Sequence, residues 1–252
     1  MTRVIGVVSG KGGVGKTITV INLSAALMEF GKNVIAVDAD VKMSGLGLQL
    51  GMYYFPVTLN DVLMDRGSIH EALYIHPSGL RIIPASLSVE NVKVSRLKRI
   101  LKDTFLKDNI VFVDTPPGLE KNTISILKSC PEILIVTTPE VPAIADAMKI
   151  ISTCKKMETK PIGIIVNMYR NRDSNQIKIE EIESTCGLPV IGIVPEDKVI
   201  KKSVFLGIPS VLLNPYSPSS IGFKQIAAHI IGENFIPPKF AFIKNFLGRF
   251  RK

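Results

Sequence analysis

The sequence has no long hydrophobic run, which argues against a membrane-spanning helix. Its longest apolar stretches, such as residues 133–136, are far shorter than the roughly 18 residues that such a helix needs. The apolar run at residues 4–8 is also short and leads directly into a glycine-rich loop, so it does not resemble a secretory signal peptide. We therefore expect a cytoplasmic protein, unless another feature holds it at a surface.

Cysteine is also scarce in this chain of 252 residues. The three cysteines, Cys130, Cys154 and Cys186, are far apart and form no C-x-x-C pair. This spacing argues against a disulfide framework and against a local zinc site. We expect all three to be buried thiols with a structural role.

Acidic residues are outnumbered by basic ones. The chain has 22 Asp and Glu against 31 Lys and Arg, which gives a formal net charge of +9. Such an excess favours anionic partners, whether nucleic acid, acidic lipid or nucleotide. A basic face that is merely solvated gives the same composition, so the charge alone does not choose among these partners.

Short apolar runs recur along the chain and alternate with helical stretches. Strands that are apolar on both faces predict a parallel sheet covered by helices on both sides. No repeat or long linker separates the runs, and the length suits one large domain. We therefore predict a doubly wound, mostly parallel α/β fold over residues 1–236, which ends before two consecutive prolines. The runs occupy residues 4–8, 34–37, 80–83, 110–113, 133–136, 162–166 and 190–194.

The stretch S-G-K-G-G-V-G-K-T at residues 9–17 contains the phosphate-binding pattern G-x-x-x-x-G-K-[ST]. It joins the run at residues 4–8 to an amphipathic helix predicted over residues 17–30. In that context backbone N–H groups surround the phosphates, Lys16 neutralises the β- and γ-phosphate oxygens, and the Thr17 hydroxyl reaches Mg²⁺. A glycine-rich turn without a ligand is the alternative. The nucleotide-binding residues predicted in this loop are Gly10, Lys11, Gly12, Gly13, Val14, Gly15, Lys16, Thr17 and Ile18.

Aspartates follow two of the predicted strands. Asp38 and Asp40 come after the run at residues 34–37, and Asp114 follows the run at residues 110–113. Ligands in doubly wound sheets bind beyond the carboxyl ends of the strands. A lone aspartate there is more simply a helix cap or a turn residue. Several beside a phosphate-binding loop supply the negative charge that a Mg²⁺–nucleotide complex needs, so they predict a metal–nucleotide site.

These motifs together resemble the MinD/ParA family of deviant Walker A ATPases, and its MinD branch more closely. The extra lysine of the loop, Lys11, is highly specific to this family, and the similarity covers nearly the whole chain. The resemblance implies a P-loop NTPase fold, binding of ATP and Mg²⁺, slow ATP hydrolysis and a homodimer in the ATP state. The matching motifs are K-G-G-V-G-K-T at 11–17, V-D-A-D at 37–40, T-L-N-D-V-L at 58–63, V-D-T-P-P-G at 113–118, T-P-E at 138–140 with Asp146, V-N at 166–167 and V-P-E-D at 194–197.

The resemblance also implies a role for each site residue. In the family the first lysine reaches across the dimer to the phosphate that the other subunit binds, so Lys11 would link nucleotide binding to dimerisation. Lys16 would hold the β- and γ-phosphates, and Asp40 would orient the attacking water. Around the metal we expect Thr17, Asp38 and Asp114, and around the adenine Asn167, Pro195, Glu196 and Asp197.

Residues 239–252, K-F-A-F-I-K-N-F-L-G-R-F-R-K, predict a separate amphipathic helix. On a helical wheel the four phenylalanines, Ile243 and Leu247 share one arc, and the basic residues from Lys244 onward fall in the complementary half. The preceding prolines, the lack of acid and the large aromatics favour an in-plane anchor on anionic lipid. A packed last helix and a DNA-binding tail are the alternatives. The MinD branch carries a membrane-targeting helix in the same place.

The expected function is therefore a positioning switch, at the division site or another cellular structure. ATP closes the homodimer, paired tails bind the inner face of the cell membrane, and hydrolysis releases the protein, faster when an activating protein partner binds. One rival is a ParA-like ATPase that binds DNA through basic surface residues. Another is an iron–sulfur cluster carrier with cysteines at a dimer seam. Residues 116–118 are P-P-G, where MinD more often has P-A-G, a feature shared by both rivals.

Overall fold

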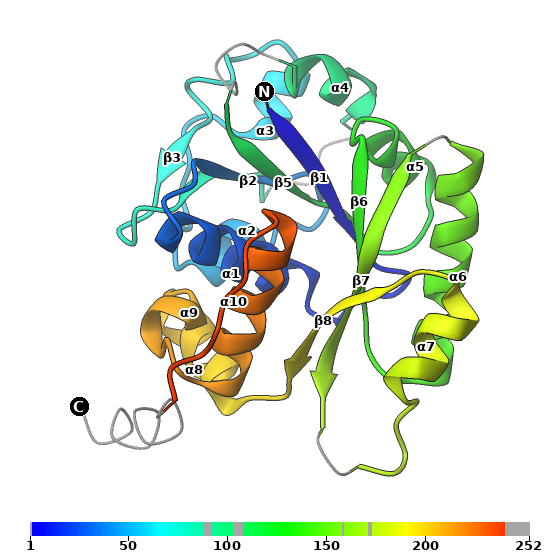
Figure 1. The fold of residues 1–252 in the computed structure, drawn as a ribbon. Helices are drawn as coiled ribbons and strands as arrows, with labels where there is room; N and C mark the ends of the chain where they lie inside the picture. The colour runs from blue at the N-terminus through cyan, green and yellow to red at the C-terminus, as the bar shows by residue number, and fades with distance from the viewer. Residues whose placement is uncertain (1, 88–91, 103–107, 158, 171–172, 240–252) are drawn as a thin grey trace.

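The described residues form one eight-stranded sheet (Figure 1). The computed structural model describes residues 2–87, 92–102, 108–157, 159–170 and 173–239. The strand order is β3-β4-β2-β5-β1-β6-β7-β8, and neighbouring strands are parallel except for the pair of β3 and β4. The predicted doubly wound, mostly parallel fold is therefore confirmed. The strands are β1 (Arg3–Val8), β2 (Val34–Asp38), β3 (Tyr74–Ile75), β4 (Arg81–Ile83), β5 (Ile110–Asp114), β6 (Glu132–Thr137), β7 (Lys160–Tyr169) and β8 (Val190–Pro195).

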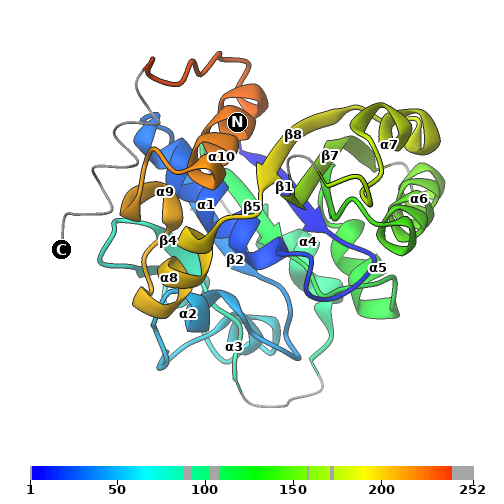
Figure 2. The ribbon, with the colours of Figure 1, turned by 90° about the horizontal axis from the view of Figure 1, so that it is seen from below.

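Helices cover both faces of the sheet, as Figures 1 and 2 show. Alternate residues of β1 enter two separate cores: Ile5 and Val7 pack with α1 and α10, while Val4 and Val8 pack with α4, α5 and α6. A strand that is apolar on both faces needs a helical layer on each side to exclude water. The helices are α1 (Lys16–Glu29), α2 (Leu46–Gln49), α3 (Leu59–Leu63), η1 (Val94–Arg96), α4 (Leu97–Ile100), α5 (Lys121–Leu127), α6 (Val141–Lys156), α7 (Ile179–Cys186), α8 (Lys198–Leu206), α9 (Ser210–Leu213) and α10 (Pro218–Ile230).

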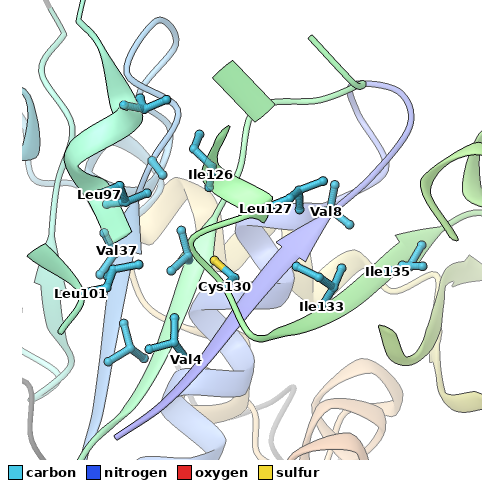
Figure 3. Packing of buried hydrophobic residues seen from close by; sticks show 14 of the residues in the cluster. Val4, Val8, Val37, Leu97, Leu101, Ile126, Leu127, Cys130, Ile133 and Ile135 are labelled. Carbon is cyan, nitrogen blue, oxygen red and sulfur yellow. The ribbon is translucent and has the colours of Figure 1, made fainter. Parts of the chain in front are cut away.

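The three cysteines belong to the apolar interior. All three are free and buried, as expected from the sequence. Figure 3 shows Cys130 among Val4, Leu127 and Ile133 in the core under α5. Burial raises the pKa of the Cys130 thiol to about 12, so the reactive thiolate is suppressed at neutral pH.

The strand order brings the predicted functional segments to one edge of the sheet. β5 lies between β1 and β2, and the register places Asp114 beside both Val7 and Asp38. The loop after β1 and the aspartates that end β2 and β5 therefore share the carboxyl edge of the sheet. This is the edge at which doubly wound folds bind their ligands.

Two features at the margins of the fold differ from the prediction or lie beyond it. The sequence pattern did not predict β3, because this edge strand has only two residues and Ile75 is exposed. The predicted amphipathic helix of residues 239–252 lies outside the described residues, apart from Lys239. Within the described ranges, no helix has the length and apolar character that crossing a bilayer requires.

Candidate functional site

The loop between β1 and α1 forms an open backbone cradle. Gly13 and Gly15 have φ angles of +80° and +89°, a conformation that favours glycine. A Cβ atom added at Gly12 or Gly13 would meet nothing within 4 Å, so this part of the loop faces open space. Because α1 begins at Lys16, the N–H groups of its first turn have no partner within the helix and are available to an anion.

Lys16 lies at the base of this cradle. Its side chain belongs to the first turn of α1, and the residue is only 8% exposed. Burial lowers the pKa of Lys16, while the charges of Asp114 and Asp40 act in the opposite direction. A buried amine between the loop and carboxylates provides a cation for phosphate oxygens at the position that the motif predicted.

Asp38 and Asp114 form a pair of buried carboxylates beside the cradle. Burial raises the pKa of Asp38 to about 6 and that of Asp114 to about 7, and the charge of Asp38 contributes to the second shift. The Thr17 hydroxyl donates a hydrogen bond of 2.6 Å to Asp114 Oδ2. Asp114 Oδ1 is buried and has no hydrogen-bond partner. The two buried carboxylates, one of which has an oxygen without a hydrogen-bond partner, and the Thr17 hydroxyl are oxygen ligands of the kind that Mg²⁺ prefers.

Asp38 also holds the segment that follows β2. Its Oδ2 accepts hydrogen bonds from the Ser44 hydroxyl and from the backbone N–H groups of Gly45 and Leu46, at 2.9–3.1 Å. The backbone N–H of Asp40 donates to Asp38 Oδ1 at 3.1 Å. A Cβ at Gly45 would lie 3.5 Å from the Thr17 hydroxyl oxygen, so this segment runs next to the predicted metal site. Asp40 and residues 44–46 are therefore tied through Asp38 to the predicted metal site.

A cavity of about 480 Å³ adjoins the cradle. Asn167 donates a hydrogen bond of 2.8 Å from Nδ2 to the backbone carbonyl of Val14, so β7 is tied to the loop. At Gly15 a Cβ would lie only 2.2 Å from that Nδ2 atom, which excludes any side chain there. The cavity is of a size suited to a small planar ligand. Its lining comprises Gly15, Ile18, Asn167, Met168, Pro195, Glu196, Asp197, Lys198, Ile200 and Lys201.

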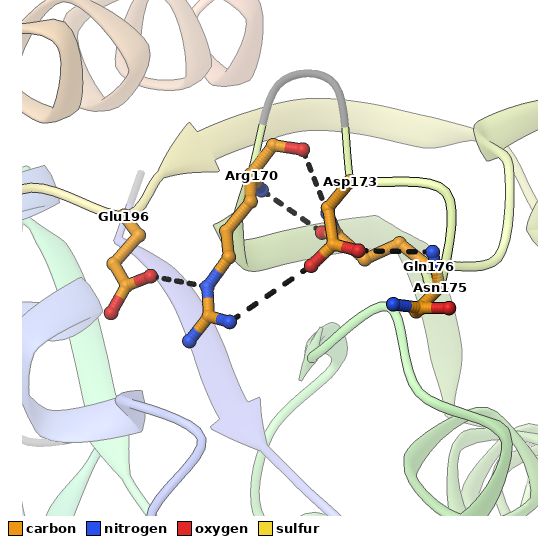
Figure 4. A network of polar contacts seen from close by, with 5 residues as sticks. All are labelled: Arg170, Asp173, Asn175, Gln176 and Glu196. Atoms are coloured by element: carbon orange, nitrogen blue, oxygen red, sulfur yellow. Dashed lines mark hydrogen bonds and ion pairs between the residues drawn. The ribbon is translucent and has the colours of Figure 1, made fainter.

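A network of polar contacts includes Glu196, one of the residues that line this cavity (Figure 4). The Arg170 side chain, just after β7, pairs with Glu196, just after β8. Its guanidinium also lies 3.9 Å from Asp173, and its backbone N–H donates to Gln176 at 2.9 Å. The network joins the loops that follow β7 and β8. Sequence analysis missed Arg170, because a lone arginine after a strand has no signal beyond its charge.

Lys11 points away from the other site residues. Its Nζ lies 2.8 Å from Glu140 Oε2, at the start of α6, and both side chains are substantially exposed, by 39% and 60%. This ion pair is the largest cause of the lowered pKa of Glu140. The structure therefore brings Lys16, Thr17, Asp38 and Asp114 together, but leaves Lys11 at the surface.

The sequence is similar to those of proteins that are named for binding nucleotides. The family model for the CobQ/CobB/MinD/ParA nucleotide binding domain matches residues 5–210. An uncharacterised ATP-binding protein of Methanocaldococcus jannaschii is 40% identical over 238 residues, which cover 93% of this chain and 90% of that protein. The match therefore includes the cradle, the aspartates and the lining of the cavity.

Two solved structures are similar to the present one over nearly its whole length. The septum site-determining protein MinD from Pyrococcus horikoshii, complexed with Mg-ADP, has a TM-score of 0.85 and 34% identity, covering 97% of this chain and 99% of that one. A chain of the MinC:MinD cell division protein complex from Aquifex aeolicus has a TM-score of 0.84 and 29% identity, covering 94% and 98%. The cradle of this chain thus lies in a fold that holds Mg-ADP in a relative.

Proposed function

The chain belongs to the CobQ/CobB/MinD/ParA nucleotide-binding family, and we propose that it is an ATP-driven positioning switch of the MinD type. The outcome of its ATPase cycle is a change in where the protein is located, because the protein stays at its target only until ATP is hydrolysed. The proposal rests on one observation above the others: Lys11 is held outside its own cradle by an exposed ion pair with Glu140. Such pairs contribute about 0–1 kcal/mol, so a phosphate on a second subunit can displace Glu140.

The residues of the cradle fit Mg²⁺-ATP, which supplies the phosphoryl group that is transferred to water. Lys16 and the first-turn N–H groups of α1 neutralise the phosphate oxygens. Thr17, Asp38 and Asp114 would hold the metal, whose positive charge would offset the cost of burying two carboxylates. Asp40 accepts a hydrogen bond from the attacking water, and its position is maintained through Asp38.

The base of the nucleotide fits the cavity beside the cradle. Asn167 offers an amide that can both donate to and accept from a base edge. The loop at Pro195, Glu196 and Asp197 forms another wall of the cavity. Arg170 stabilises that wall through its ion pair with Glu196. Closure of a second subunit over this face would bring Lys11 to the phosphates bound by its partner.

We assign membrane binding to residues 239–252, on their sequence pattern alone. Each Lys or Arg near an anionic surface contributes up to about 1 kcal/mol, and a short helix must also be ordered on binding. One tail is therefore a marginal anchor. Two tails on one ATP-bound dimer gain an effective-concentration advantage that can reach roughly 10²–10⁴. ATP would place the protein on the inner face of the membrane, and an activating protein would promote release.

Sedimentation with anionic liposomes in ATP and in ADP tests this switch. We expect binding that is stronger in ATP and that is lost on deletion of residues 239–252 and in Lys11→Ala. Lys32→Ala is the matched control, because Lys32 forms a similar exposed ion pair of 2.9 Å with Glu233 far from the cradle. Binding that is equal in both nucleotides, or unchanged in Lys11→Ala, would contradict the proposed coupling.

DNA binding is the second candidate, favoured by the net charge of +9. A ParA-like protein would bind duplex DNA through basic residues of the folded domain, so deletion of residues 239–252 would leave that binding largely intact. An iron–sulfur carrier is disfavoured, because all three cysteines are buried within the domain. Electrophoretic mobility of duplex DNA with both forms of the chain separates the first two functions.

A further inference from the structure

Large apolar side chains are exposed in two segments that lie outside the nucleotide site. Tyr54, after α2, is 83% exposed, and Phe205, at the end of α8, is 88% exposed. A soluble domain rarely leaves such side chains grouped in water unless the surface binds something. We call this surface the α8 patch and define it as Leu48, Tyr53, Tyr54, Phe205, Leu206 and Ile208, all exposed.

The two segments of the α8 patch touch through their backbones. A Cβ added at Gly207 would lie 2.8 Å from the carbonyl oxygen of Leu50 and 3.1 Å from the nitrogen of Gly51. The buried His76 side chain lies 3.1 Å from the same Leu50 oxygen and also contacts the backbone of Gly207. Figure 2 shows α2 next to α8. The chain segments that carry Tyr54 and Phe205 therefore meet at one junction.

Lysines occupy the helix face that carries Phe205. Lys198, Lys201 and Lys202 are exposed, and they precede Phe205 by seven, four and three residues, so all four side chains lie on one side of α8. No acidic residue occurs in residues 46–55 or in residues 198–213. Glu196 and Asp197 directly precede α8 and share a pocket with Lys198 and Lys202, so the positive charge is compensated in part. The surface near Phe205 combines aromatic rings with an excess of lysine.

We propose that the α8 patch is a second contact with anionic lipid, in addition to the tail. Tyr54 and Phe205 enter the headgroup region of the bilayer, and Lys202, which does not line the cavity assigned to the base, binds its phosphates. This inference rests on the proposed function, since a patch of this size orients a protein that its tail has already brought to the membrane. It fixes which face of the ATPase domain meets the bilayer.

A lipid surface fits these residues better than nucleic acid does. Duplex DNA binds lysines through its phosphates but leaves aromatic rings in water. Aromatic side chains beside lysines, without acid, are typical of segments that lie in the membrane interface. The long lysine side chains can also extend toward phosphates while their methylene groups cover the apolar surface.

Substitutions in the full-length chain test the patch. The variants are Tyr54→Ser, Phe205→Ser and Lys202→Glu, and we measure their binding with ATP to vesicles of equal parts phosphatidylcholine and phosphatidylglycerol. We expect about tenfold weaker partition for each aromatic variant and at least about fivefold weaker partition for Lys202→Glu. The matched controls are Met148→Ser and Lys156→Glu, exposed residues of α6 on the far side of the sheet. They should bind like wild type.

A fluorescent probe distinguishes direct lipid contact from an indirect effect. Because the three native cysteines are buried, a single cysteine in Tyr54→Cys can be labelled selectively with an environment-sensitive dye. We expect its emission to shift to shorter wavelength when vesicles are added with ATP. The same dye at Met148→Cys should not shift. An emission spectrum at position 54 that vesicles leave unchanged would overturn the proposal, even if the serine variants fold poorly.

The outcomes separate this inference from the function on which it rests. If wild type does not bind vesicles in ATP, the membrane switch and the α8 patch contact both fail. If wild type binds and the patch variants bind equally well, only the patch contact fails. If the patch variants keep vesicle binding but lose binding to duplex DNA, the surface is a nucleic-acid site and the lipid assignment is wrong.

Discussion

Replacing Asp114 with asparagine should stabilise the metal-free protein while damaging its function. Burial raises the pKa of Asp114 from 3.8 to about 7, and the neighbouring Asp38 contributes. Each pKa unit corresponds to about 1.4 kcal/mol, so ionised Asp114 costs up to about 4 kcal/mol of folding free energy at pH 8. Part of that cost arises from repulsion between Asp114 and Asp38, and the variant weakens the hydrogen bond from Thr17. We expect a net stabilisation of about 2 kcal/mol, or about 4–8 °C in Tm.

The sign of the pH dependence follows from the same shift. An unfolded aspartate loses its proton near pH 4, whereas the folded Asp114 keeps it until about pH 7. Between these values the folded state binds more protons, so the stability of the wild type falls as the pH rises. The advantage of Asp114→Asn should therefore be full above pH 7 and should shrink as the pH is lowered toward 4.

Thermal unfolding in EDTA, followed by circular dichroism at pH 8 and pH 5, measures this effect. Glu180→Gln, which removes an exposed carboxylate from α7, is the control and should leave Tm nearly unchanged. Addition of Mg²⁺-ADP should raise the Tm of the wild type more than that of Asp114→Asn. A variant that melts at or below the wild-type temperature at pH 8 would refute the argument that ionised Asp114 strains the empty site.

Four further substitutions test the loop and the cavity. Lys11→Ala should change Tm by less than about 4 °C, because its exposed ion pair contributes at most about 1 kcal/mol, but should abolish ATP-dependent dimers in light scattering. Gly10→Ala should lower Tm and nucleotide affinity, because its Cβ would lie 2.1 Å from Asp146 Cβ; Gly12→Ala meets nothing in the monomer and should leave Tm unchanged. Asn167→Ala should weaken binding of a fluorescent ATP analogue by about tenfold. An unchanged affinity would show that Asn167 does not contribute to binding of the base.

The phosphate-binding loop could be found from the sequence because its requirements are local. Glycine is needed at Gly13 and Gly15 for positive φ, and Lys16 and Thr17 reach the cradle simply by beginning α1. The apolar runs likewise predicted the strands to within a few residues, since a strand buried on both faces needs hydrophobic residues throughout. The fold prediction and the family resemblance are both confirmed.

Other parts of the site depended on residues far apart in the chain. Asp38 and Asp114 could each be placed at a strand end, but only the strand order, with β2 beside β5, makes them neighbours and raises both pKa values. Sequence alone placed Asn167 after the apolar run at residues 162–166. It gave no sign that the Asn167 amide would donate a hydrogen bond to the backbone carbonyl of Val14. Such contacts depend on sheet register and side-chain packing, which no local pattern records.

The amino-acid sequence by itself determined the elements of this protein, its loop chemistry and its family. Those properties follow from backbone preferences and from hydrophobic periodicity within short windows. The tertiary structure decided which surfaces the elements share: Lys11 lies against Glu140, and the segment that follows α2 meets the end of α8 through the contact of Gly51 with Gly207. Packing two helical layers onto one twisted sheet brings distant segments together, and the free energy of burying both cores selects that arrangement.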